Sequence, residues 1–228
     1  MRELGVYAEV RSSDTPAAEL AGRKGLILSG GPASVYEEAS PKVDAAIFSS
    51  GAAALGICYG QQLMAHLLGG SVRPGVKGEY GLAQLEPIGP SALLRDLPAG
   101  SQIWMSHRDL VDSPPPGFRV AARTQTCDVA AMEDAARRLY GVQFHPEVVH
   151  THGGMEMLSR FLFDICGCQR DWNPKHRIPL LEQEIRDVAA GRNVFFFVSG
   201  GVDSTVACTL CIRALGQGRV RAVYVDTG

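Results

Sequence analysis

The feature that most constrains this fold is the alternation of short apolar runs with segments of helical periodicity. Near the N-terminus the apolar runs Leu4–Val10, Gly25–Leu28 and Ala52–Ile57 have the length of strands, and Asp14–Ala21 has a helical pattern. Strands that alternate with helices pair in parallel and carry the helices on the faces of the sheet. We therefore expect an α/β fold with a mostly parallel sheet at this end of the chain.

The middle of the chain has a different pattern. Gln61–Leu68 and Met155–Cys166 place apolar residues at helical spacing. Between them, from Gly81 to Phe144, short strands and turns predominate, and Ser113–Gly117 contains three consecutive prolines. Because short strands joined by turns pair antiparallel, we expect a mixed sheet flanked by helices.

A second α/β pattern begins near the C-terminus. The polar stretch Gly167–Pro179 is followed by a helical segment, Leu180–Ala190, and a strand, Asn193–Val198. We place the domain boundary near residue 170. The predicted parts are a first domain at 1–168, a linker and helix at 169–192, and the start of a second domain at 193–228.

Composition excludes several classes of protein. The 228 residues are 20% charged with a net charge of −2, and no long block of like charge suggests a nucleic-acid surface. Apolar stretches are too short to span a bilayer, and the N-terminus lacks a signal-peptide pattern. We expect a cytoplasmic protein without nucleic acid or membrane as partner. Cys208-x-x-Cys211 lies in an apolar helical run, which favours buried structural thiols over a redox pair.

Cys58 lies where a buried strand turns into a helix, in the segment Gly56–Gln62. Glycines two residues to either side allow a tight bend that points the cysteine outward, as in a serine nucleophile elbow. A helix N-terminus also favours thiolate over thiol. The pattern predicts a nucleophile, and a buried core cysteine is the alternative.

His145 and Glu147 flank a proline that follows a strand. Proline forces the preceding residue into an extended conformation, so the two side chains point to the same side and can meet. A carboxylate that orients an imidazole facing a thiol completes a nucleophile, base and orienting group. A solvated turn is the alternative for this segment.

The two segments together resemble the class I glutamine amidotransferases, whose signatures are a G-x-C-x-G-x-Q elbow and a distant H-P-E. The match spans roughly residues 4 to 166. It implies a flavodoxin-like fold in which Cys58 attacks the side-chain amide of glutamine, His145 moves the proton and Glu147 holds His145. It also implies oxyanion donors at the backbone amides of Gly31 and Tyr59. From the sequence alone, the glycine pair at Gly31 also fits a plain turn.

The same resemblance assigns residues that hold glutamine. Gln62 matches the family glutamine that binds substrate, although a glutamine on a helix surface is the alternative. Trp104–Asp109 matches the family loop that grips the α-amino and α-carboxylate groups. Ser106 and His107 are its expected contacts, partly through their backbone, and an ordinary loop histidine is the alternative for His107.

A second motif, Val198-Ser-Gly-Gly-Val-Asp-Ser-Thr205, follows the strand Asn193–Val198 and opens a helix. Backbone amides and hydroxyls at a helix N-terminus form an anion-binding nest, whereas the alternative is a turn with an N-cap. No lysine stands where a Walker motif requires it. The motif resembles the loop of N-type ATP-pyrophosphatases, with a Rossmann-like fold. The expected ATP-binding residues are Ser199, Gly200, Gly201, Val202, Asp203, Ser204, Thr205 and Asp226.

The fusion of these two motifs resembles the glutamine-hydrolysing GMP synthetases, as do Gly78-Glu-Tyr-Gly81 and Trp172-Asn-Pro174. The resemblance implies a carbon–nitrogen ligase that makes GMP, AMP, pyrophosphate and glutamate from xanthosine 5′-monophosphate (XMP), ATP and glutamine, with Mg²⁺ accompanying ATP, and a homodimer for the full-length family member. The metal ligands are not identified by the sequence. The alternatives are a glutaminase subunit of another ammonia-using synthase and an inactive binding or regulatory module.

Both ends of the chain depart from the family pattern. The resemblance begins at Met1–Gly5, after the family's first strand, and ends at Gly228, two strands into the second domain. We expect a fragment or truncated product, with a gap beside the amidotransferase sheet and a weakly packed C-terminal part of about 30 residues. Such a chain is expected to make no GMP and to hydrolyse glutamine poorly.

Overall fold

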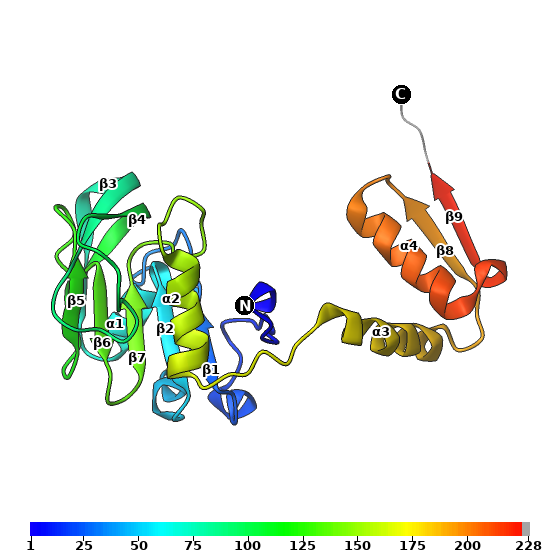
Figure 1. The fold of residues 1–228 in the computed structure, drawn as a ribbon, viewed down its shortest axis with the longest axis horizontal. Coiled ribbons are helices and arrows are strands. Elements are labelled where there is room, and N and C mark those ends of the chain that lie inside the picture. Colours follow the sequence, from blue (N-terminus) through cyan, green and yellow to red (C-terminus); the bar gives the residue numbers. More distant parts are fainter. Residues whose placement is uncertain (225–228) are drawn as a thin grey trace. The chain divides into compact units, whose positions relative to one another are not determined.

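The computed structural model describes residues 1–224, and the side chains of all of these except residues 76 and 77. The chain divides into two compact units (Figure 1). One contains Glu3–Arg170, and the other begins at Asp171. Among the described residues, no helix is long and apolar enough to cross a membrane.

The first unit is built on a seven-stranded mixed sheet in the order β1-β2-β7-β6-β5-β3-β4. β1, β2 and β7 are parallel, and every remaining pair is antiparallel. The strands are β1 (Gly25–Leu28), β2 (Ala53–Ile57), β3 (Ser71–Pro87), β4 (Ser101–Ser113), β5 (Arg119–Arg123), β6 (Ala131–Asp134) and β7 (Leu139–Val142). The predicted combination of a parallel part with an antiparallel middle is confirmed.

Strand β2 is buried along its whole length because a helix covers each face of the sheet (Figure 1). Ala54 packs in one apolar cluster with Leu63 and Met64 of α1 (Tyr59–Leu67). Leu55 lies in the other cluster, which includes residues of α2 (Gly154–Arg160). A π-helical turn, Phe161–Ile165, continues α2. A parallel strand with both faces covered reads as a continuous apolar run, which is why the sequence identified it.

Two predictions near the N-terminus were wrong. Arg2–Leu4 is a 3₁₀ turn and the following residues are irregular, so Leu4–Val10 is not a strand. The apolar run does not form a buried strand, because Val10 is 98% exposed and Glu9 forms ion pairs with Arg11 and Arg23. The predicted helix over Asp14–Ala21 is reduced to the 3₁₀ turn Ala17–Leu20 after Pro16. A further 3₁₀ turn, Ala45–Ser49, precedes β2.

The second unit contains a βαβ arrangement. Strands β8 (Val194–Val198) and β9 (Val220–Tyr224) are parallel, and α4 (Val202–Leu215) with the 3₁₀ turn Gln217–Arg219 connects them. Cys208 and Cys211 are buried as free thiols in its apolar cluster, as the sequence pattern predicted.

Helix α3 (Pro174–Ala189) begins at Pro174, six residues before the predicted start at Leu180. The Asn173 side chain caps it by accepting from the Lys175 amide at 2.9 Å. Pro174 at the first helical position loses little, since the first N–H groups of a helix have no partner within it. Pro179 lies inside the helix, where it removes one hydrogen bond to the preceding turn.

The close approach of α1 to β1 generates a prediction about stability. A Cβ atom on Gly60 would lie 2.2 Å from the Leu28 carbonyl oxygen, far inside van der Waals contact. We expect Gly60→Ala to lower the free energy of unfolding of the first unit by about 1–3 kcal/mol or more, because backbone must move. Urea denaturation measures this.

Gly31→Ala is the matched control, since the nearest atoms to its Cβ would be 3.9 Å away. Equal stability of the two variants would contradict the packing described for α1.

Candidate functional site

Cys58 stands between β2 and α1 in a backbone conformation that is unusual for a side-chain-bearing residue. Its φ is 53° and its ψ is −108°. Such conformations cost about 1–3 kcal/mol and persist where surrounding structure imposes them. The Cys58 amide donates to the Val142 carbonyl of β7 at 2.7 Å, and its carbonyl accepts from the amides of Gln61 and Gln62. The strained elbow is therefore held from both sides.

The flanking glycines make this elbow possible. A Cβ atom on Gly56 would lie 2.5 Å from the Gly60 carbonyl oxygen and 2.6 Å from the Gln61 amide nitrogen. Gly60 in turn lies against the Leu28 backbone of β1. Both glycines are thus required by close contacts between backbone segments, as the sequence pattern suggested.

His145 and Glu147 form the pair that the proline between them predicted. His145 Nδ1 lies 2.7 Å from Glu147 Oε1. The imidazole is largely buried, whereas the carboxylate is about half exposed, with 17% and 49% of the side chains accessible. A carboxylate at this distance fixes the ring orientation and favours a proton on Nδ1.

The structure brings Cys58 and His145 together. A Cβ atom added to Gly30 would lie 3.0 Å from His145 Cε1 and 3.5 Å from Cys58 Cβ, so both side chains approach the same position. Interaction with Cys58 is the largest cause, and Glu147 the next, of a rise in the pKa of His145 to about 10, which burial opposes. His145 Nε2 is buried and makes no hydrogen bond of regular geometry. The nitrogen that Glu147 does not use is therefore left for the thiol.

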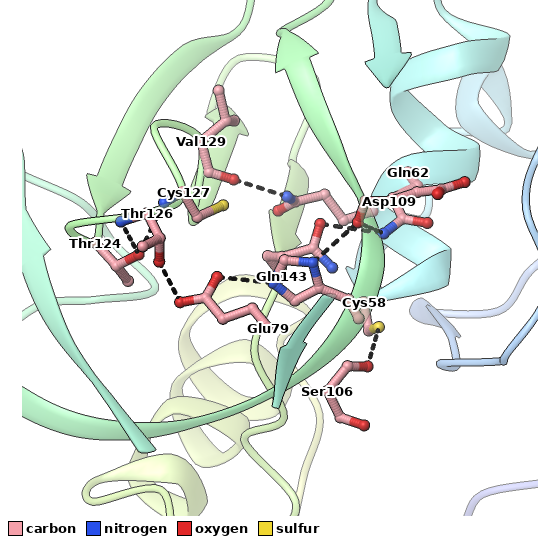
Figure 2. A network of polar contacts seen from close by, with 12 residues as sticks. Cys58, Gln62, Glu79, Ser106, Asp109, Thr124, Thr126, Cys127, Val129 and Gln143 are labelled. Carbon is pink, nitrogen blue, oxygen red and sulfur yellow. Dashed lines mark hydrogen bonds and ion pairs between the residues drawn. The ribbon is translucent and has the colours of Figure 1, made fainter. Parts of the chain in front are cut away.

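The Cys58 thiol has a second neighbour on β4. Its Sγ lies 3.6 Å from the Ser106 carbonyl oxygen, and Figure 2 shows the two groups facing each other. Ser106 itself is exposed. The resting thiol is thus held between a carbonyl group that can only accept its proton and an imidazole that can take it.

Gly31 and Tyr59 lie beside each other across this site. A Cβ on Gly31 would be 3.9 Å from the Tyr59 Cβ. Tyr59 is the first residue of α1, so its N–H has no acceptor within the helix. The amides expected to hold an oxyanion therefore come from neighbouring segments.

The side chains of Gln62 and His107 take part in an internal polar network. Figure 2 labels Gln62 and its partners Asp109 and Gln143. Gln62 Nε2 donates to the Asp109 carbonyl at 2.6 Å and to Gln143 Oε1 at 3.2 Å. His107 Nδ1 lies 3.0 Å from the same Asp109 carbonyl, and its Nε2 lies 3.1 Å from Glu79 Oε2. Both side chains are buried, whereas Ser106, which the sequence also assigned to glutamine binding, is exposed.

The hydrogen bonds of His107 determine where its protons lie. A carbonyl oxygen only accepts, so Nδ1 carries a proton and donates it to Asp109, while Nε2 faces the Glu79 carboxylate. Burial is the largest influence on the pKa of His107 and lowers it, while Glu79 opposes this effect. The Thr126 hydroxyl donates to the other oxygen of Glu79.

In the second unit, Ser199–Thr205 covers the loop after β8 and the first turn of α4, and it is exposed apart from the partly buried Ser204. Gly200 has a φ of 79°, a conformation that glycine adopts without strain. Ser204 Oγ accepts from the Ser199 amide at 3.3 Å and donates to the Gly201 carbonyl at 3.1 Å. The Thr205 hydroxyl donates to the same carbonyl at 2.9 Å. Asp226, the remaining predicted residue, lies outside the described residues.

Residues 1–165 match the family Glutamine amidotransferase class-I. The chain belongs to this family. Residues 175–227 match the family NAD synthase. The predicted class I amidotransferase fold and the resemblance to GMP synthetases are both confirmed by these comparisons and by the relatives described next.

Two curated relatives of this amidotransferase carry the name GMP synthase [glutamine-hydrolyzing]. The one from Geobacillus kaustophilus is 46% identical over 230 residues, and the one from Symbiobacterium thermophilum is 48% identical over 231. Both alignments cover 100% of this chain and 45% of the relative. This chain therefore spans less than half the length of these relatives.

A crystal structure from Thermoplasma acidophilum, described as that of a GMP synthase subunit, is also similar. It is 32% identical with a TM-score of 0.64, and the match covers 73% of this chain and 84% of that chain. The similarity supports the amidotransferase fold for the first unit.

Two contacts around the candidate site were not predicted from the sequence. Glu79 was noted only within a family motif, although β3 and β4 pair it directly with His107. The Ser106 carbonyl was expected near a ligand, not against the Cys58 thiol. Both contacts depend on how β4 is placed in the fold, which no local pattern encodes.

Within the described residues, no cluster of three or more histidine, cysteine or acidic side chains is arranged to hold a metal ion. The candidate site around Cys58 contains a thiol, an imidazole and one carboxylate. Its arrangement suits nucleophilic attack with proton transfer.

The raised pKa of His145 leads to a prediction for Glu147→Gln. The stability that this raised pKa contributes is complete below the ordinary value of 6.5, declines as the pH rises above it, and is lost above about 10. Removing the carboxylate charge should lower the midpoint of the His145 titration by about one unit or more. Ring-nitrogen NMR against pH measures both midpoints.

Glu156→Gln, which removes an exposed carboxylate on α2, should leave the His145 midpoint unchanged. A native midpoint near the ordinary histidine value of 6.5 would contradict the described environment of His145.

Proposed function

We propose that this chain carries the glutamine-hydrolysing site and the first ATP-binding loop of a GMP synthase. The observation that carries the proposal is the strained Cys58 elbow beside the His145–Glu147 pair. Attack on an amide requires a nucleophile, a group that donates a proton to leaving ammonia and donors for the oxyanion. The first unit offers a candidate for each.

In the proposed first half-reaction, the Cys58 thiolate attacks the side-chain amide carbon of glutamine. The developing oxyanion is held by the backbone N–H groups of Gly31 and Tyr59. The His145 imidazolium gives its proton to the nitrogen, and the C–N bond breaks to release ammonia and leave a glutamyl thioester. Glu147 stabilises the imidazolium and holds its ring throughout.

In the second half-reaction, His145 takes a proton from water, which attacks the thioester. The carbon–sulfur bond breaks, glutamate leaves and Cys58 returns to its starting state. Ser106 and the backbone of His107 are proposed to hold the α-amino and α-carboxylate groups of glutamine. Gln62 is proposed to support this substrate site through the Asp109 carbonyl, which it shares with His107.

The second unit suggests where the ammonia is used. The names of the curated relatives and the NAD synthase match of residues 175–227 both support an ATP-dependent amidation. Ser199–Thr205 and Asp226 are proposed to bind the phosphates of ATP. The enzyme would adenylate XMP with loss of pyrophosphate, and ammonia would then displace AMP to give GMP. Cytoplasmic location and a homodimer are part of the same proposal.

Mg²⁺ would accompany ATP, neutralising charge on its phosphates. The ion binds through phosphate oxygens and one or two carboxylates. Asp203 is the one acidic residue in Ser199–Thr205, and its carboxylate would be a ligand for the ion.

A glutaminase subunit that serves a separate synthase is the second candidate. The description of the Thermoplasma acidophilum protein as a subunit favours it for the first unit. The Ser199–Thr205 loop argues for the fused enzyme, because a separate glutaminase has no use for an ATP-binding loop.

We predict that Cys58→Ala reduces glutamate release from glutamine by at least about 10³-fold, because no other group replaces the nucleophile. In the longer enzyme, synthesis from free ammonia should remain, since the ATP site does not use Cys58. Coupled assays of glutamate and GMP measure the two activities. Cys168→Ala, which removes a half-buried free thiol elsewhere, is the control.

Equal loss of glutamine-dependent and ammonia-dependent synthesis in Cys58→Ala would contradict two separate sites. Glutamate release at the native rate would contradict the assignment of the nucleophile.

We also predict that Ser199→Ala and Ser204→Ala each weaken ATP binding by the longer enzyme by about tenfold, because charge-assisted hydrogen bonds to phosphate are lost. Calorimetric titration with ATP measures the affinity. Thr209→Val is the control, since this hydroxyl donates to the Thr205 carbonyl within α4. Unchanged affinity in both serine variants would rule out the loop as the phosphate site.

A further inference from the structure

The strand β4 contacts both members of the Cys58–His145 pair. The Ser106 carbonyl lies 3.6 Å from Cys58 Sγ. Two residues earlier, the Trp104 carbonyl accepts from the His145 amide at 3.0 Å. One short segment of β4 therefore contacts both groups and fixes how the thiol and the imidazole lie relative to each other.

A third residue, Thr151, joins His145 to this strand. Thr151 Oγ1 accepts from the Trp104 amide at 3.0 Å and donates to the His145 carbonyl at 2.6 Å. In a regular antiparallel pair, the Trp104 amide would donate directly to the His145 carbonyl. The threonine hydroxyl is inserted between these groups and replaces that single hydrogen bond with two.

The direction of this bridge is fixed by chemistry. An amide can only donate and a carbonyl can only accept, so the single hydroxyl proton points to His145. Thr151 is 6% exposed, so water has little access to replace the hydroxyl. Serine can form the same bridge, whereas valine has the shape of threonine and neither hydrogen-bonding role.

The segment that carries Thr151 is itself held on β4. The His152 amide donates to the Gln102 carbonyl at 2.9 Å, and Gln102 Nε2 donates to the His150 carbonyl at 3.0 Å. The Thr151 amide donates to the Val148 carbonyl at 3.1 Å, which closes the turn after Glu147. The hydroxyl is therefore presented by a braced turn, not by a free loop.

We propose that Thr151 is a positioning residue for His145: its hydroxyl sets the spacing between the His145 backbone and β4, and so aligns the imidazole with the Cys58 thiol. The inference deepens the proposed glutaminase function and rests on it. The Thr151 hydroxyl bonds to backbone groups of Trp104 and His145. It acts through the His145 carbonyl, and misplacement of a reacting group by about 1 Å costs on the order of 10²-fold in rate.

The test compares Thr151→Val with Thr151→Ser. The first measurement is the rate of Cys58 alkylation by iodoacetamide as a function of pH, followed by mass spectrometry of the Cys58 peptide. It needs no turnover of glutamine. The second is kcat and KM for glutamate release. Thr124→Val is the matched control, because Thr124 is also 6% exposed and its hydroxyl accepts from the amides of Thr126 and Cys127, away from His145.

We expect Thr151→Val to lower the alkylation rate near neutral pH by about tenfold and to move its pH profile towards that of an ordinary thiol. Its kcat should fall by about 10- to 100-fold, with KM changing less than about threefold. Thr151→Ser should stay within about threefold of the native protein in every measurement. Thr124→Val should lose thermal stability comparable to that lost by Thr151→Val and keep the native pH profile.

A native alkylation profile in Thr151→Val, or equal impairment of the serine and valine variants, would overturn the positioning role. The same holds if Thr151→Val loses stability without a change in the profile. If the native protein shows an ordinary thiol profile, the proposed Cys58–His145 pair fails together with this inference. If that profile is perturbed and responds as expected but no glutamate is released, the positioning role stands and the proposed function fails.

Discussion

The backbone of Cys58 is the constraint on which the rest of the site depends. A cysteine at a φ of 53° is strained, and the strain is held by the hydrogen bond from its amide to Val142 of β7. This bond exists only because β2 and β7 are parallel neighbours in the sheet. The close approach of Gly60 to the Leu28 backbone then fixes the direction of α1. The fold thus determines the orientation of a single thiol.

Strand β4 contributes the second set of contacts that hold the site. β4 is the far edge strand of the sheet, yet its carbonyls at Trp104 and Ser106 contact His145 and Cys58. The Glu79–His107–Asp109 network holds the next part of the same strand and links it to Gln62 on α1. Nucleophile, imidazole and the proposed substrate-binding segment are therefore connected through hydrogen bonds of buried or partly buried groups. Such networks favour one arrangement, because an unpaired buried polar group is costly. Among the described residues, Asp109 Oδ2 and Gln143 Nε2 are buried atoms of this network without a hydrogen-bond partner.

The sequence revealed the parts of the site whose chemistry is encoded locally. Gly56, Cys58 and Gly60 lie within five residues, and His145, Pro146 and Glu147 are consecutive, so spacing alone predicted an elbow and an oriented imidazole. Thr151 and Glu79 gave no comparable signal. Their roles arise from contacts with residues at least six positions away in sequence, which only the folded sheet brings together.

The wrong predictions have a related cause. The apolar run Leu4–Val10 forms a strand only if a neighbouring strand pairs with it, and the described sheet contains none beside this segment. Burial also limits what a local pattern says about Gln62 and His107: both side chains are hydrogen-bonded inside the protein, and their assignment to a substrate site stays a prediction. Local patterns report what a residue is able to do, whereas burial and register decide what it does.

The central claim is that the strained Cys58 is a nucleophile that forms a glutamyl thioester. Acid quenching of the chain during reaction with glutamine, followed by peptide mass spectrometry, tests this claim most directly. The account predicts a glutamyl adduct on the peptide that contains Cys58, removed by treatment with hydroxylamine and not formed by Cys58→Ala. Release of glutamate with the adduct on another cysteine, or unchanged release by Cys58→Ala, would contradict it.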